Sequence, residues 1–139
     1  MAALKRSLTT MAAVGVLLGG GPAVAAGAEV SAAAPNTSPA AASRQFISGG
    51  GSVTCQSQYA CASVPYGNGA YVFKFFRYGR YSLSDWLGRG IAANSQTGGA
   101  AMRLENRNQV QIGCIPAGVS GIGVDWDPVW FINLTASPC

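Results

Sequence analysis

The chain has 139 residues, a net charge of +4, four Cys and no His. Without His it lacks the residue that enzymes use most often as a general base, and also the commonest metal ligand. Its five acidic residues are too few to favour a dedicated carboxylate-rich metal cage. The length is that of a single domain.

The first 25 residues have the order of a secretory signal peptide. Lys5 and Arg6 give a positive start, an apolar run follows from Met11 to Leu18, and Ala23-Val24-Ala25 form a small-residue cleavage site. Ala26-Gly27-Ala28 is an alternative site, so cleavage after Ala28 stays open. The apolar run is far shorter than the roughly 20 residues that cross a bilayer. We therefore predict a signal-peptide helix within 1–25 and no membrane span.

Cleavage leaves seven basic and five acidic residues, a net charge of +2. This charge is too small and too dispersed for a nucleic-acid-binding surface, so no nucleic acid partner is expected. The signal peptide and the Ala/Gly bias are typical of a secreted, extracellular bacterial protein.

Residues 26–45 are rich in Ala, Pro and Ser and contain no aromatic residue. Such a stretch buries too little apolar surface to offset its ordering entropy, so the sequence predicts a disordered leader. A propeptide is the alternative interpretation.

Residues 46–139 are predicted to form one all-β domain. No segment keeps a 3.6-residue apolar period, and no internal repeat is evident. Short runs rich in β-branched and aromatic residues are instead bounded by Gly, Asn, Ser and Pro. One helical turn is expected over Ser82–Leu87. The predicted strands are Ala60–Val64, Ala70–Phe76, Gly90–Asn94, Ala100–Glu105, Gln109–Ile115, Gly121–Asp125 and Val129–Leu134.

The strongest of these strands is Ala70–Phe76. Period-two alternation places Tyr71, Phe73 and Phe75 on one face, and Val72, Lys74 and Phe76 on the other. Some seven short strands at this spacing favour a sandwich or a small barrel.

The four cysteines of an exported chain are expected to pair, and four allow three connectivities. We favour Cys55–Cys61 with Cys114–Cys139, because the second bridge closes a long loop and fixes the carboxyl terminus. A zinc site is disfavoured, since no two Cys are separated by two residues.

A series of short motifs runs from Cys55 to Cys139. Cys55–Cys61 has a C-x5-C spacing with an aromatic residue inside, and a Gly-bearing turn follows at 66–69. The most specific elements are Tyr81-Ser82-Leu83-Ser84-Asp85-Trp86 and Asn94-Ser95-Gln96-Thr97-Gly98-Gly99, with Trp126-Asp127-Pro128-Val129-Trp130 near the end. This series resembles the small secreted actinobacterial metalloproteinase-inhibitor family, which has a β/γ-crystallin-like fold.

The resemblance implies a small, disulfide-stapled Greek-key sandwich that inhibits an extracellular peptidase, most often a metalloprotease. It implies a binding protein without catalytic residues or a cofactor, and a secreted protease is the expected partner of a monomer. The candidate inhibitory loops are Gln56–Ala60 and Tyr66–Ala70. Tyr59, Tyr66 and Asn68 are the predicted partner-binding residues, because aromatic anchors dominate the energy of interfaces.

Two other features have a functional alternative. The aromatic tract from Tyr71 to Tyr81 is interpreted as core, with a glycan-stacking face as the alternative. Asp125 and Asp127 are interpreted as a solvated turn, with acid–base chemistry or a cation site as the alternative. Neither feature changes our expectation of no enzyme activity and no metal. A structural or cell-surface module that binds glycan, cation or protein without inhibiting a protease is the alternative function.

Overall fold

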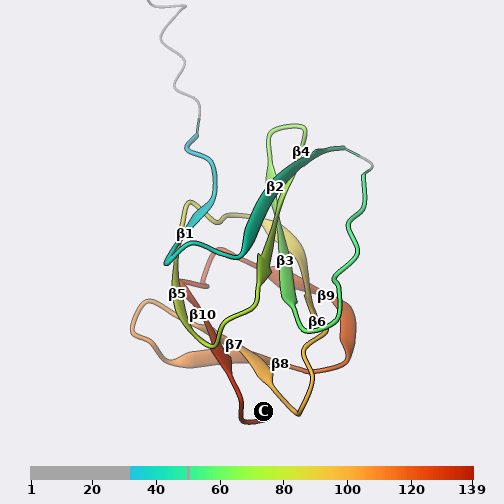
Figure 1. Ribbon diagram of the computed structural model, residues 1–139. Coiled ribbons are helices and arrows are strands. Elements are labelled where there is room, and N and C mark those ends of the chain that lie inside the picture. Colours follow the sequence, from blue (N-terminus) through green and yellow to red (C-terminus); the bar gives the residue numbers. More distant parts are fainter. Residues whose placement is uncertain (1–31, 50) are drawn as a thin grey trace, which may run out of the picture. The chain divides into compact units, whose positions relative to one another are not determined.

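The computed structural model describes residues 32–49 and 51–139. The predicted signal peptide and the first residues of the predicted leader lie outside the described residues. The described part forms ten strands (Figure 1): β1 (Asn36–Ser38), β2 (Ser43–Ser48), β3 (Ala60–Tyr66), β4 (Gly69–Phe75), β5 (Gly79–Ser84), β6 (Arg89–Asn94), β7 (Ala101–Glu105), β8 (Gln111–Pro116), β9 (Val119–Asp125) and β10 (Phe131–Thr135).

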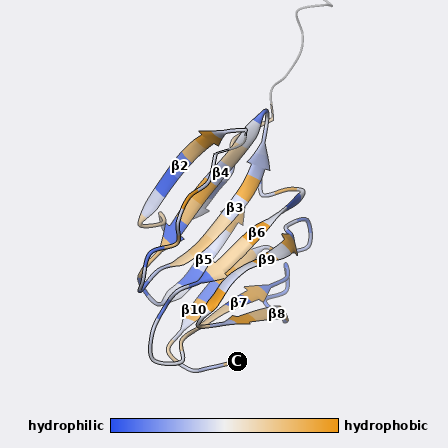
Figure 2. Cartoon of the chain, turned by 90° about the vertical axis from the view of Figure 1, so that its right-hand side faces the viewer, coloured by the Kyte–Doolittle hydropathy of each residue, from blue (hydrophilic) through white to orange (hydrophobic). Residues whose placement is uncertain are grey.

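The strands form two five-stranded sheets in which all neighbours are antiparallel. Sheet A has the order β1-β5-β10-β7-β8, and sheet B has the order β2-β4-β3-β6-β9. Figure 2 shows the strands of sheet B following one another from β2 to β9. No helix of residues 32–49 and 51–139 has the length and apolar character that crossing a membrane requires.

The hydrophobic core lies between the two sheets. In β4 the side chains of Phe73 and Phe75 are fully buried and Lys74 is half-buried, while Phe76, directly after the strand, is exposed. The predicted alternation therefore holds from Phe73 to Phe76, whereas Val72, predicted on the outward face, is buried and Tyr71 is half-buried. Sheet A contributes Met102, Ile115, Ile132 and Leu134, all fully buried, to the other side of the core.

The topology is an internal duplication of four strands. Strands β3 to β6 form the first motif and β7 to β10 the second, and in each motif the third strand lies in the opposite sheet. Thus β5 pairs with β10 in sheet A, and β9 pairs with β6 in sheet B. This exchange interlocks two Greek keys, which confirms the predicted all-β, β/γ-crystallin-like sandwich.

The duplication leaves one trace in the sequence, although no longer internal repeat is evident there. Asp85-Trp86 and Asp125-Trp126 occupy the same place, at the end of the third strand of each motif. The two indole rings are buried and meet edge to face, with centroids 4.9 Å apart and planes at 86°. Each indole N–H donates to a backbone carbonyl, of Asn36 at 2.9 Å and of Ser63 at 2.8 Å. The Trp pair therefore links the two motifs at the centre of the core.

The structure corrects the predicted leader. Residues 36–48 form β1 and β2, which add to the outer edges of β5 and β4. Pro35 and Thr37 are buried, and the Arg44 guanidinium donates to the Pro35 carbonyl at 2.9 Å. Backbone hydrogen bonds to two existing strand edges order this segment, although it has few apolar residues of its own. The domain therefore begins before Phe46.

The predicted helical turn over Ser82–Leu87 is also wrong. Residues Gly79–Ser84 form β5, in which Tyr81 and Leu83 are buried and Ser82 and Ser84 are exposed. The two Ser residues resemble helix caps in sequence, but they are the outward positions of an alternating strand.

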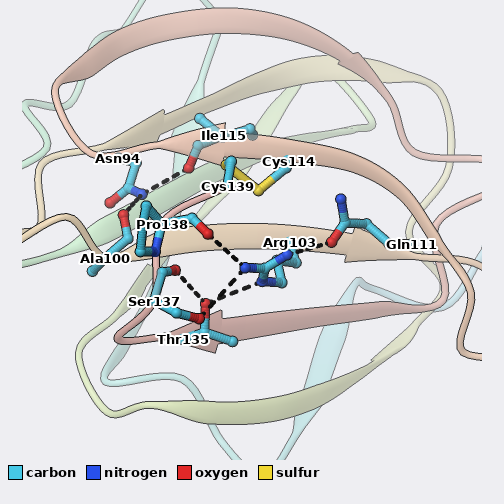
Figure 3. The surroundings of a disulfide bond; sticks show 10 residues. All are labelled: Asn94, Ala100, Arg103, Gln111, Cys114, Ile115, Thr135, Ser137, Pro138 and Cys139. Atoms are coloured by element: carbon cyan, nitrogen blue, oxygen red, sulfur yellow. Dashed lines mark hydrogen bonds between the residues drawn. A yellow bond between two sulfur atoms is a disulfide. The ribbon is translucent and has the colours of Figure 1, made fainter.

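Both predicted disulfides are confirmed. Cys55 is bonded to Cys61, and Cys114 is bonded to Cys139. Figure 3 shows how Arg103 supports the second bridge. Its guanidinium donates to Thr135 Oγ1 at 3.1 Å and to the Pro138 carbonyl at 2.7 Å, so the carboxyl-terminal segment is held on sheet A.

Candidate functional site

The segment between Cys55 and Cys61, here called the clamped loop, is fixed by a disulfide and by hydrogen bonds. The disulfide closes it, and hydrogen bonds dock it on Ser95, which lies in the connection between β6 and β7. Gln58 N–H donates to the Ser95 carbonyl at 2.8 Å, and Ser95 N–H donates to the Tyr59 carbonyl at 2.9 Å. Ser95 Oγ also donates to the Cys55 carbonyl at 3.1 Å.

The clamped loop still presents side chains to solvent. Gln56, Ser57 and Gln58 are exposed, and Gln58 has a positive φ of 79°. L-residues rarely adopt such a positive φ, so the fixed backbone of the loop holds Gln58 in an uncommon conformation. The loop is therefore rigid in its backbone and open at its tip.

One aromatic ring of the clamped loop, Tyr59, lies with Phe76 and Tyr78 around the same hollow, and we call these three residues the aromatic patch. Tyr59 precedes β3 and Phe76 follows β4, so antiparallel pairing of these strands brings the rings to a centroid distance of 5.4 Å. Phe76 is 48% exposed and Tyr78 is 56% exposed. The patch borders a hollow of about 560 Å³ that also includes Pro39, Arg77 and Arg80.

The two Arg residues beside the patch, Arg77 and Arg80, differ in their surroundings. Arg80 forms a bidentate pair with the buried Glu105 carboxylate, at 2.7 and 3.2 Å. The hydrogen bond to Glu105 raises the pKa of Arg80 above its ordinary value. Asn133 donates to the same carboxylate at 3.0 Å, so this group is a structural anchor. Arg77 is exposed at the rim of the hollow.

Tyr81 connects the patch to the core. Its ring is buried against Phe75, and its hydroxyl donates to the Arg77 carbonyl at 2.8 Å. Burial raises the pKa of the Tyr81 hydroxyl. This contact fixes the backbone from which Arg77 and Tyr78 project.

The structure does not bring the three predicted partner-binding residues together. Tyr59 lies at one end of the β3–β4 hairpin, while Tyr66 and Asn68 lie at its turn. Seven residues of extended chain put about 23 Å between the two Tyr backbones. Tyr66 is half-buried against Tyr71, with ring centroids 5.4 Å apart, and Asn68 is exposed. Sequence reasoning proposed two loops, and the structure places them at opposite ends.

Asn68 borders a second hollow, on the outer face of sheet B. Its carbonyl accepts the Gly49 N–H at 2.9 Å, which holds the start of the β2–β3 connection near the β3–β4 turn. The hollow has a volume of about 700 Å³, and its lining includes Ile47, Val72 and Ile91 and no charged residue. A ligand in this hollow would therefore make apolar contacts and would meet no charged side chain of the lining.

The carboxylates of Asp125 and Asp127 are used in backbone turns. Asp125 Oδ1 accepts the Asp127 N–H at 3.1 Å, and Asp127 Oδ1 accepts the Gly88 N–H at 2.7 Å. These bonds support the interpretation as a turn. Among the described residues no group of three His, Cys, Asp or Glu side chains could hold a metal ion.

The aromatic tract divides between two roles. Phe73, Phe75 and Tyr81 are buried in the core, as the first interpretation predicts, while Phe76 and Tyr78 are exposed in the patch. From the sequence, these last two were included only within the tract for which a glycan-stacking face was the alternative, and were not named as partner-binding residues. The signal was present, because Phe76 falls on the outward face of the predicted strand.

Comparisons of this chain with protein-family models, with curated proteins and with solved structures gave no significant match.

Proposed function

We propose that this chain is an exported, non-enzymatic binding protein that inhibits an extracellular peptidase through its clamped loop. The observation that carries the proposal is the loop itself. One disulfide and three hydrogen bonds to Ser95 fix its backbone, while Gln56, Ser57 and Gln58 remain exposed.

Rigidity is what a peptidase inhibitor requires of its binding loop. A loop that is already ordered loses little conformational entropy when it docks, so more of the contact energy appears as affinity. A fixed backbone also resists the distortion that cleavage demands. Tyr59 adds a large ring that is already held against Phe76. Aromatic rings of this kind are common anchors at interfaces.

The proposal includes no catalytic step. The chain contains no His, and all four Cys are disulfide-bonded. Binding energy from the loop and the aromatic patch is the whole of the proposed activity.

The test is a titration of the purified protein against a panel of secreted metalloproteases and serine proteases. We expect tight, stoichiometric inhibition of at least one metalloprotease. The Cys55→Ser/Cys61→Ser double variant should inhibit it about 10-fold or more weakly, because the opened loop must be ordered on binding. The Cys114→Ser/Cys139→Ser variant is the matched control. Failure of the wild-type protein against the whole panel would reject inhibition.

A second candidate function is glycan binding, and the exposed rings of Phe76 and Tyr78 favour it. Flat rings beside a hollow can stack on the apolar faces of sugars. Binding to insoluble polysaccharides that is lost in Tyr78→Ala, without any protease inhibition, would support this alternative over the first.

Export is part of the proposal and has its own test. The intact mass of secreted protein should lack residues 1–25, or 1–28 if the second site is used. Recovery of the full-length chain from the membrane fraction would contradict it.

A further inference from the structure

The connection between β6 and β7 carries a second exposed loop beside the clamped loop. Its residues 97–99 (Thr-Gly-Gly), here called the glycine loop, are all exposed. Ser95, which accepts the Gln58 N–H and donates to the Tyr59 carbonyl, lies only two residues before the glycine loop. Two residues of chain span at most about 7 Å. The clamped loop and the glycine loop are therefore neighbours at one end of the molecule.

The glycine loop is a tight turn that leaves space around it. The Ala100 N–H donates to the Thr97 carbonyl at 3.5 Å, and between them Gly98 and Gly99 have φ of 72° and 77°. Glycine adopts such angles without the steric cost that a side chain brings. A Cβ added to either glycine would meet no other part of the chain within 4 Å. Another molecule can therefore approach the backbone of this turn closely.

The backbone groups of the two glycines are available for pairing. Among the described residues, no hydrogen bond engages the N–H or the carbonyl of Gly98 or Gly99. Main-chain groups of this kind can hold an extended peptide segment, and such bonds do not depend on the side chains of that segment. The glycine loop is thus suited to contact the backbone of a partner protein.

One buried side chain fixes the connection on both sides of the glycine loop. Asn94 is fully buried at the end of β6, and its Oδ1 accepts the Gln96 N–H at 3.1 Å. Its Nδ2 donates to the Ala100 carbonyl at 3.3 Å and to the Ile115 carbonyl at 2.9 Å, as Figure 3 shows. Residues before and after the glycine loop are therefore tied to one point. The glycine loop, like the clamped loop, is ordered before a partner arrives.

The two loops also share the absence of charge. Residues 45–73 and 90–102, which contain both loops, include no Lys, Arg, Asp or Glu. Their exposed tips, Gln56–Gln58 and Thr97–Gly99, present amide, hydroxyl and backbone groups. Such a surface offers hydrogen bonds and no ionic anchor, so it is complementary to an uncharged segment of a partner.

We propose that the glycine loop is a second binding loop, which docks together with the clamped loop on one peptidase. This inference rests on the proposed function, because it takes the same peptidase as the partner. The free backbone groups of Gly98 and Gly99 pair with an extended, uncharged backbone segment of that peptidase. Two loops that are already ordered on one frame add contacts at little further entropic cost. Asn94 is the positioning residue, since it holds the glycine loop without reaching the surface.

Gly98→Asn tests the proposal by adding a side chain where the partner backbone would lie. Asn adopts a positive φ more readily than most L-residues, and its Cβ meets open space at this position, so the fold should be kept. We expect the inhibition constant for a susceptible metalloprotease to rise at least about tenfold, because the new side chain obstructs the pairing. The melting temperature of the variant shows that it folds.

Gly67→Asn is the matched control. Gly67 also has a positive φ, of 55°, and a Cβ there meets nothing within 4 Å, but it lies in the β3–β4 turn at the opposite end of the hairpin. This variant should leave the inhibition constant within about twofold of the wild type. An equal loss of inhibition in both variants would contradict a specific role of the glycine loop.

Hydrogen exchange gives a second readout that needs no variant. The Gly98 and Gly99 amides of the disulfide-intact protein should exchange at least about tenfold more slowly in the complex with the inhibited metalloprotease than in the free protein. Inhibition that survives Gly98→Asn, or glycine amides that exchange equally fast with and without the peptidase, overturns this inference and leaves the proposed role of the clamped loop intact. A wild-type protein that inhibits no peptidase of the panel overturns both.

Discussion

At the scale of single residues, two glycines on neighbouring strands differ sharply in what surrounds them. A Cβ at Gly90 would collide with the carbonyl oxygen of Ser63 and with Nε1 of Trp126, which are hydrogen-bonded to each other. A Cβ at Gly123 would meet no atom within 4 Å. Gly90 therefore lets the central Trp pair approach the backbone of β3.

Gly90→Ala should lower the free energy of unfolding by about 1–3 kcal/mol, because neither the backbone carbonyl nor the indole can move away freely. Gly123→Ala should be neutral or slightly stabilising, since Ala loses less backbone entropy in a strand. Urea unfolding at low protein concentration measures both. Equal effects of the two substitutions would show that contact of the new Cβ with Ser63 and Trp126 does not destabilise the Gly90→Ala variant.

Tyr81 makes stability depend on pH in the alkaline range. Burial raises the pKa of its hydroxyl in the folded protein, so the unfolded chain ionises first as pH rises. The contribution is fully present below the ordinary Tyr pKa of about 10 and is lost above it, with a slope of at most about 1.4 kcal/mol per pH unit.

Tyr81→Phe should therefore make the loss of stability between about pH 9 and 11 shallower than in the wild type. At neutral pH it should cost about 1 kcal/mol, for the hydrogen bond to the Arg77 carbonyl. Thermal unfolding across this pH range is the measurement. Parallel curves for the two proteins would contradict the assignment of the alkaline titration to Tyr81.

At the scale of strands and loops, the sequence predicts what alternation makes visible. Strands β3, β4 and β6 to β10 coincide with predicted runs to within a few residues, because each has one row of apolar side chains for the core. The β1 and β2 strands were not predictable in this way. They are ordered by backbone hydrogen bonds to the edges of β5 and β4. Residues 36–48 contain no pattern from which those edges could be predicted.

The two disulfides close loops of very different length and should differ in their effect on stability. Chain-entropy estimates give about 2.3 kcal/mol for the loop from Cys55 to Cys61 and about 3.5 kcal/mol for that from Cys114 to Cys139. The Cys114→Ser/Cys139→Ser variant should therefore unfold at the lower denaturant concentration. If the Cys55→Ser/Cys61→Ser variant were the less stable one, loop length would not explain the difference. The hydrogen bonds to Ser95 would then depend strongly on the Cys55–Cys61 disulfide.

At the scale of the whole molecule, the fold class could be predicted and the site only in part. The Cys spacing and the motif order indicated a stapled Greek-key sandwich, which the topology confirms. The grouping of Tyr59 with Phe76 and Tyr78 requires knowledge of strand register, because these residues meet only when β3 pairs with β4. Without the strand register, the sequence also could not show that Tyr59 and Tyr66 lie at opposite ends of the β3–β4 hairpin.

The central claim is that binding resides at the clamped end of the β3–β4 hairpin, and inhibition constants of two matched variants test it most directly. Tyr59→Ala should weaken inhibition of a susceptible metalloprotease by about 10- to 100-fold, the loss of about 1–3 kcal/mol expected for an aromatic anchor. Tyr66→Ala, a change of the same size at the turn end, should leave the constant within about twofold. A larger loss from Tyr66→Ala than from Tyr59→Ala would contradict the account.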